Sequence, residues 1–148
     1  MILTEEINEN YEFKNPVTIR AEQADNGIRI IIKDRDNKVF FFLSAICMSI
    51  NKTDDELDNY GLLVTNFEYA PCVKDKPIFN DALIIFVNYA NYAMFVAENG
   101  EIKARYKYVW TKCNANEKCE FAESVGLIPF GNEADLLIYK GELENQDA

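Results

Sequence analysis

The 148-residue chain contains no histidine. This absence excludes an imidazole general base, a Ser-His-Asp or Cys-His pair and a histidine metal ligand. The sequence also lacks GxGxxG, GxSxG and the phosphate-binding loop motif, and no pair of carboxylates stands out by its spacing. From these absences we expect a protein that is not an enzyme, with no catalytic residues and no bound metal or cofactor.

Positive charge is scarce as well, because 15 lysines and arginines face 25 aspartates and glutamates, for a net charge of −10. Such a chain repels a phosphate backbone, so we expect no direct nucleic-acid partner. No apolar run approaches the ~20 residues of a membrane-spanning helix, and the first ten residues lack the features of a signal peptide. The sequence thus favours a cytoplasmic protein; a secreted protein with a trimmed start is the alternative.

Only four cysteines are present, and none forms a CxxC pair. The spacing of Cys113 and Cys119 allows them to close a short loop. Four reduced thiols, including Cys47 and Cys72, fit the same count, so the disulfide state stays open.

Apolar residues, in contrast, make up 49% of the chain and aromatic residues 13%, far above the composition of a disordered protein. The length suits one domain over residues 1–148, and we expect flexible acidic ends at 1–14 and 142–148.

Most of the chain has the pattern of β-strands. Residues 17–22 and 28–33 flank Asn26-Gly27, the favoured tip of a hairpin, and a polar turn at 34–38 leads into 39–43. Further strands are expected at 63–69, 83–89, 92–97, 102–110 and 136–139, and short helices at 54–60 and 116–125, the second ended by Gly126. In the strand at 63–69, Leu63, Thr65, Phe67 and Tyr69 share one face. Because strands and helices do not alternate, we predict a mainly β fold: an antiparallel meander, closed or strongly bent into a β-barrel of about eight strands.

One segment carries a family resemblance. Asn88-Tyr89-Ala90-Asn91-Tyr92 is followed by an expected short strand, an Asn99-Gly100 turn, a long strand, Lys112 and a helix. This order over roughly residues 83 to 127 resembles the end of a lipocalin, in which an Asp-Tyr-x-x-Tyr segment precedes the last barrel strand, a basic residue and an outer helix. The lipocalin Gly-x-Trp has no counterpart, since the only tryptophan is Trp110. The resemblance implies a calycin-type β-barrel.

A barrel of this size has an interior that holds one small ligand. The leading hypothesis is therefore a non-catalytic protein that binds a small, largely apolar ligand inside the barrel. The expected lining residues are Phe67, Tyr69, Phe86, Phe95, Tyr106, Tyr108 and Trp110. The alternative for each is an ordinary core position.

A second hypothesis rests on the acidic residues of the expected first helix. It describes a small acidic inhibitor of viral or mobile-element type, which blocks a basic surface of a target protein. Its interaction patch comprises Asp54, Asp55, Glu56 and Asp58.

Overall fold

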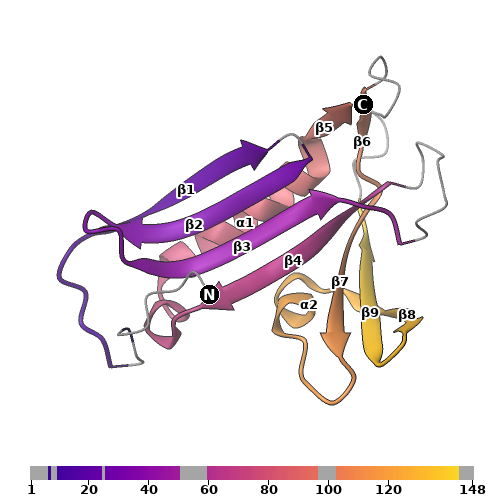
Figure 1. Ribbon diagram of the computed structural model, residues 1–148. Helices are drawn as coiled ribbons and strands as arrows, with labels where there is room; N and C mark the ends of the chain where they lie inside the picture. Colours follow the sequence, from indigo (N-terminus) through magenta and orange to yellow (C-terminus); the bar gives the residue numbers. More distant parts are fainter. Residues whose placement is uncertain (1–6, 8–9, 25, 51–59, 97–102, 144–148) are drawn as a thin grey trace.

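The computed structural model describes residues 7, 10–24, 26–50, 60–96 and 103–143. Over these ranges the main element is a seven-stranded sheet with the order β1-β2-β3-β4-β7-β9-β8 (Figure 1). Its strands are β1 (Val17–Ala24), β2 (Gly27–Asp34), β3 (Val39–Cys47), β4 (Gly61–Tyr69), β7 (Tyr108–Asn114), β8 (Ile128–Glu133) and β9 (Leu136–Glu142). Neighbouring strands are antiparallel except β4 and β7, which are parallel. The fold is mainly β as predicted, but the sheet is open, with β1 and β8 as its edges, so the predicted barrel is not formed.

The first hairpin follows directly from its sequence. β1 and β2 meet at Ala24 and Gly27 across the predicted turn. A Cβ atom at Gly27 would lie 1.9 Å from the Ala45 carbonyl oxygen of β3, so this strand start requires glycine. The next turn is closed by the carboxylate of Asp34, which accepts the backbone N–H groups of Asp36 and Lys38 at 2.9 and 3.0 Å.

The longest helix, α1 (Pro77–Tyr92), occupies the stretch in which the sequence analysis predicted a strand at 83–89. Pro77 starts the helix, where its missing N–H costs nothing. The prediction was wrong because Ile84 and Val87 are apolar yet exposed, which hides the helical period of the buried positions. The buried positions are Phe79, Ala82, Leu83, Phe86 and Ala90.

The helix α1 also removes the structural basis of the lipocalin-like motif. Asn88 to Tyr92 form the last part of α1 rather than the end of a barrel strand. The long strand predicted at 102–110 is also wrong. It divides into β6 (Lys103–Arg105), which pairs with β5 (Met94–Val96) in a separate two-stranded sheet, and β7 of the main sheet. At the break, Lys107 donates its N–H to the Tyr60 carbonyl oxygen and accepts the N–H of Leu143, both at 3.0 Å.

Further along the chain, the predicted helix begins later than expected. α2 spans Glu120–Val125 and ends, as predicted, at Gly126, whose φ of 78° is left-handed. The strand β9 confirms the prediction at 136–139, whereas β8, which contains Pro129 and Gly131, was not predicted. The helix expected at 54–60 lies outside the described residues.

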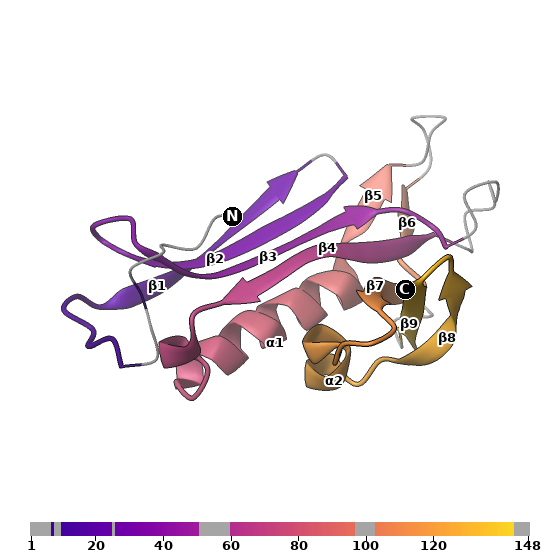
Figure 2. The same ribbon diagram turned by 60° about the horizontal axis from the view of Figure 1, so that its bottom comes forward.

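Two apolar clusters stabilise the sheet from opposite faces. Figure 2 shows α1 and α2 together on one face, where they cover the main core. The second cluster joins Leu63, Tyr108, Trp110 and Ile138. Leu63 lies between Leu62 and Val64 of the main core, and side chains alternate along a strand, so the second cluster occupies the other face.

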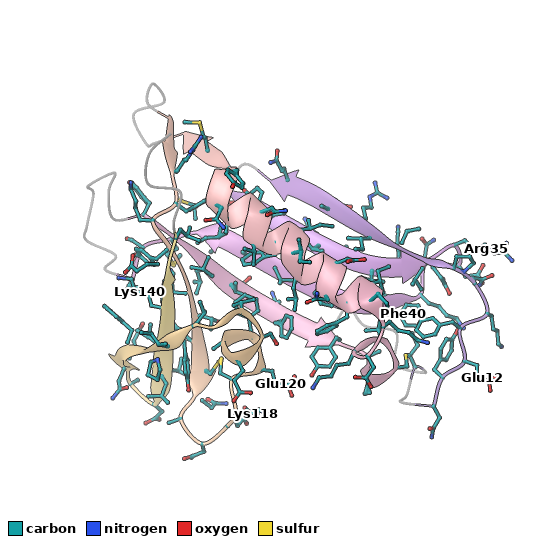
Figure 3. All side chains as sticks on the ribbon, turned by 180° about the vertical axis from the view of Figure 1, so that it is seen from behind. Glu12, Arg35, Phe40, Lys118, Glu120 and Lys140 are labelled. Carbon is teal, nitrogen blue, oxygen red and sulfur yellow. A yellow bond between two sulfur atoms is a disulfide. The ribbon has the colours of Figure 1, made fainter. Side chains whose placement is uncertain are left out.

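The segment before β1 packs on the main core. Ile7 is buried, and the rings of Tyr11 and Phe13 lie 5.6 and 5.0 Å from the fully buried ring of Phe40, which Figure 3 labels. None of the helices within the described ranges is long and apolar enough to cross a membrane.

Candidate functional site

The parallel pair β4–β7 opens into a fork. The two strands pair over four positions, from Gly61 opposite Tyr108 to Val64 opposite Thr111. Beyond these pairs β4 stays beside β3 and β7 stays beside β9, so the carboxyl ends of β4 and β7 separate (Figure 1). In sheets with parallel strands, ligands bind at such carboxyl ends, where neighbouring strands lead into different connections. The fork is therefore the first place to search for a site.

A β-bulge in β4 lies at the point of separation. Ser44 of β3 stands opposite Asn66 and Ala45 opposite Val64, so Thr65 is an extra residue with no opposite residue in β3. A bulge bends its strand and is frequent beside active sites. The side chains around it are linked, because the hydroxyls of Ser44 and Thr65 lie 2.7 Å apart and the Asn66 amide donates to the Ser44 hydroxyl at 2.9 Å.

The bulge also corrects one prediction about faces. The sequence pattern predicts Leu63, Phe67 and Tyr69 on the same side of one regular strand. In the structure Leu63 belongs to the second cluster, whereas Phe67 and Tyr69 pack against the main core. One extra residue reverses the alternation, because the side-chain period of a strand is two.

The fork encloses a cleft of about 400 Å³, bounded by β4, β7 and the segment from Asn114 to Phe121. Four ionisable side chains line it, and Figure 3 shows two of them, Lys118 and Glu120, near the start of α2. Lys112 forms an ion pair with Glu133 at 3.0 Å. The ionisable lining residues are Lys112, Glu117, Lys118 and Glu120.

A hydrogen bond joins the two walls of the fork. The Tyr69 hydroxyl of β4 donates to the Glu120 carboxylate of α2. Burial, together with this carboxylate, raises the pKa of Tyr69 to about 12. At neutral pH the phenol therefore keeps its proton and holds Glu120 in place.

The inner wall of the fork is aromatic. The ring of Phe121 lies 5.3 Å from that of Phe67 and 5.6 Å from that of Phe86 on α1. The cleft is thus lined by polar and charged side chains together with the rings of Phe67 and Phe121.

The start of α2 is tied to β7 by a disulfide between Cys113 and Cys119, whose Cα atoms are 5.8 Å apart. The spacing of the two cysteines had left this bond open as one alternative. Cys47 and Cys72 are free thiols. Burial raises the pKa of Cys47 to about 11 and also raises the pKa of Cys72, so neither thiol forms the thiolate that a nucleophilic cysteine needs. In the described part of the chain, no three acidic or cysteine side chains cluster as metal ligands.

The structure scatters the seven residues that were expected to line a ligand cavity. Phe67 and Tyr69 lie at the fork, and Phe86 is buried beneath it. Tyr106 belongs to the main core, whereas Tyr108 and Trp110 belong to the second cluster on the other face. The side chain of Phe95 and the acidic residues Asp54, Asp55, Glu56 and Asp58 lie outside the described residues.

Most residues that line the fork were not predicted as site residues from the sequence. Thr65, Asn66, Lys112 and Glu120 come together only because β4 and β7 pair in parallel across a long stretch of sequence. No local pattern marks such a pairing. The one available signal was the long apolar stretch after β4, which would have suggested a crossover connection had it been interpreted as a helix.

No protein-family model matches the chain, and no curated protein matches it in sequence. One similar solved structure is that of Arabidopsis thaliana NAA60 in complex with a bisubstrate analogue. The TM-score is 0.57 at 7% sequence identity, over 82% of this chain and 78% of that chain. NAA60 is an N-acetyltransferase with a GNAT-like fold. The chain shares that fold.

This likeness corrects several expectations from the sequence. The lipocalin resemblance is wrong, because the sheet is open and its relative in fold is an N-acetyltransferase. Neither the barrel that binds an apolar ligand nor the acidic inhibitor is supported. The expectation of a non-catalytic protein is also overturned, since the fold is one that an enzyme uses.

Proposed function

We propose that the protein transfers an acyl group to an amine and that the cleft between β4 and β7 is the reaction site. The observation that supports this most is the fork itself: two parallel strands separate at the bulged Thr65, in a fold shared with an N-acetyltransferase. The charged and polar side chains of the cleft suit an amine, and the rings of Phe67 and Phe121 in its lining suit the apolar part of an acyl donor.

Acyl transfer from a thioester makes two demands on the protein. The amine nitrogen attacks the carbonyl carbon, a C–N bond forms, the C–S bond breaks and the sulfur leaves as a thiolate. The carbonyl oxygen becomes negative on the way, so a fixed N–H group beside it accelerates the reaction. The amine nitrogen must also lose protons, one of which ends on the departing sulfur.

We assign the N–H role to the backbone of Thr65. This residue has no opposite residue in β3, and the β4–β7 pairing stops one residue before it. Its position at the head of the fork places the amide where the two strands begin to separate. A backbone amide held by a sheet is a rigid donor, which is what stabilisation of a developing oxyanion requires.

We assign the proton-accepting role to Glu120. Its carboxylate lines the cleft and is held by the Tyr69 hydroxyl. Amines are mostly protonated at neutral pH, so a carboxylate both attracts the ammonium and takes its proton. The Cys113–Cys119 disulfide fixes the residue that immediately precedes Glu120.

The test is an acetyl-transfer assay with a radiolabelled acetyl thioester and a set of peptides with free α- and ε-amines. We expect Glu120→Gln to lower kcat about 100-fold. The matched control is Glu123→Gln, the same change at a carboxylate of α2 that does not line the cleft, with kcat within about twofold. An unchanged kcat in Glu120→Gln would show that this carboxylate is not the proton acceptor. If the wild-type protein transfers the acetyl group to none of the amines, the proposed function is wrong.

Thr65 is tested separately. Thr65→Pro removes the backbone N–H, whereas Thr65→Ala keeps it. We expect kcat to fall about 100-fold in the proline variant and to stay within about threefold in the alanine variant, with circular dichroism confirming that both remain folded. Equal loss in the two variants would assign the effect to the Thr65 hydroxyl instead.

The cytoplasmic location stays a proposal. Comparison of the thiol count in protein isolated from its source under acid quenching would test it, because the cytoplasm keeps thiols reduced and an oxidising compartment preserves the Cys113–Cys119 bond.

A further inference from the structure

The acyl donors of transferases are often thioesters of coenzyme A, whose nucleotide end carries phosphates. Proteins hold phosphates on successive free N–H groups at a helix N-terminus, commonly in a glycine-rich turn. In the described part of the chain α1 is the only helix of eight residues or more, and it begins beyond the end of β4, at one arm of the fork. The connection of residues 70–77, between β4 and α1, is therefore the segment that phosphates on a donor in the cleft would meet.

Most N–H groups of this connection already have a partner within the chain. Pro71 and Pro77 have none. Four of the six remaining N–H groups donate to carbonyl oxygens within the chain: Ala70 to Phe40, Val73 to Ala70, Lys74 to Pro71 and Lys76 to Val73, at 2.8, 3.0, 3.3 and 3.0 Å. Consequently no two successive residues from 70 to 77 keep an N–H group for an anion.

The side chains do not replace the missing amides. The connection contains no glycine that would let a phosphate approach the backbone closely. The ammonium groups of Lys74 and Lys76 lie over aromatic rings, 5.6 Å from the centroid of Tyr69 and 5.3 Å from that of Phe13. The acidic residues Asp75 and Asp81 stand near them in the sequence. The whole chain carries −10, which opposes the approach of a polyanion.

Both lysines that line the cleft are ion-paired, Lys112 with Glu133 at 3.0 Å and Lys118 with Glu123 at 3.2 Å, so the cleft favours an uncharged arm. Its volume of about 400 Å³ is at the small end of the range for ligand sites, and the rings of Phe67 and Phe121 are part of its lining. The amides of Asn66 and Asn114 also line it and can hydrogen-bond to a neutral amide.

We infer that the protein does not hold the phosphates of its acyl donor: the donor is recognised by its uncharged thioester arm, and a phosphate-free acyl thioester serves as well as acetyl-coenzyme A. This inference rests on the proposed function. It concerns the substrate class of the same cleft.

The experiment compares kcat/KM for acetyl-coenzyme A and S-acetylpantetheine with one amine acceptor. We expect the two values to agree within about threefold, and adenosine 3′,5′-bisphosphate at millimolar concentration not to inhibit. A preference of about 30-fold or more for acetyl-coenzyme A, or competition by the bisphosphate, would overturn the inference while leaving the proposed function intact. If neither thioester reacts, the proposed function fails and this inference fails with it.

A double variant tests independently whether the lysines of the connection hold phosphate. Lys74→Gln with Lys76→Gln removes the only cationic side chains of the connection. We expect kcat/KM for both donors to change by less than about twofold. A drop of about tenfold or more for acetyl-coenzyme A alone would show that these lysines hold phosphate, and would contradict the inference.

Discussion

Trp110, at the scale of single residues, is completely buried, and its indole N–H donates to the Met48 carbonyl oxygen at 2.7 Å. The sequence pattern showed that this side chain faces inward. The acceptor of this N–H lies in a loop far away in the sequence. The place of Trp110 in the second cluster could therefore not be predicted from the sequence.

We expect Trp110→Phe to lower the free energy of unfolding by about 2–4 kcal/mol, because it leaves a cavity and removes a buried hydrogen bond. Urea denaturation measures this. Ile128→Ser is the control, since Ile128 is 67% exposed and its loss should change stability by about 0.5 kcal/mol or less. Similar small effects in both variants would show that the second cluster contributes little.

Tyr69 gives a pH-dependent prediction. Its pKa rises from 10.0 in an unfolded chain to about 12 in the folded protein. The stability linked to this group is therefore complete below about pH 10 and is lost as the pH rises towards 12. The pKa values of Tyr106 and Cys47 are also raised by burial, so the wild-type protein loses stability at high pH in any case.

The comparison that isolates Tyr69 is the difference between wild type and Tyr69→Phe. We expect this difference in unfolding free energy, measured by urea denaturation at each pH, to shrink between about pH 10 and 12, because folding raises the pKa of Tyr69 from 10.0 to about 12. A difference that stays constant over the window would contradict the raised pKa.

Among the elements, the short parallel ladder between β4 and β7 is sensitive to side-chain size at its first pair. A Cβ atom at Gly61 would lie 2.3 Å from the Tyr108 ring, whose hydroxyl accepts the Ile50 N–H at 2.9 Å. We expect Gly61→Ala to cost about 1–3 kcal/mol in unfolding free energy because the ring must move. Gly131→Ala is the matched control, since nothing lies within 4 Å of its added Cβ. Equal melting temperatures for the two variants would contradict the close packing of this pair.

The Cys113–Cys119 disulfide is the second prediction for an element. It closes a short loop, with a sequence separation of 6, so its loss should cost about 2 kcal/mol. Thermal unfolding of a Cys113→Ala, Cys119→Ala variant measures this. Reductant should lower the melting temperature of the wild type and leave that of the variant unchanged; an equal shift in both would assign the effect to another group.

Elements with a local signal were predictable from the sequence, and those without one were not. Asn26-Gly27 fixed the first hairpin, and Gly126 marked the end of α2. α1 was mistaken for a strand because its exposed side also carries apolar residues. The bulge at Thr65 leaves no trace in the alternation of its neighbours, so the faces of Phe67 and Tyr69 were assigned by an unbroken period of two.

At the scale of the whole molecule, the order of the strands separates an open sheet from a barrel. β1 and β8 are the two edges, six strand spacings apart in a seven-stranded sheet. At ~4.8 Å per spacing this is about 29 Å along the sheet, whereas the edges of a closed barrel are neighbours. The candidate site depends on the same order, because the fork exists only where β7 joins β4 from a distant part of the chain. The order of the strands depends on contacts between distant segments. The spacing of apolar residues along the sequence therefore does not predict it.

Spin labels on Thr18→Cys and Asn132→Cys, in a background with Cys47 and Cys72 replaced by alanine, measure the separation of the edges. We expect double electron–electron resonance to give a distance between the two labels well above 20 Å, even though the twist of the sheet shortens it. A distance near 10 Å would restore the barrel.

Among the described residues, the four pairs between β4 and β7 are the only backbone ladder that joins the two parts of the main sheet. Each part is continuous in sequence, residues 17–69 on one side and 108–142 on the other. Cooperative opening units tend to follow such continuous motifs, so the molecule has a natural boundary along this ladder. Amide protons in β7 and β9 would then exchange with solvent together, at a rate different from that of the amide protons in residues 17–69. A ligand bound across the fork would slow both sets at once and make the two parts respond as a single unit.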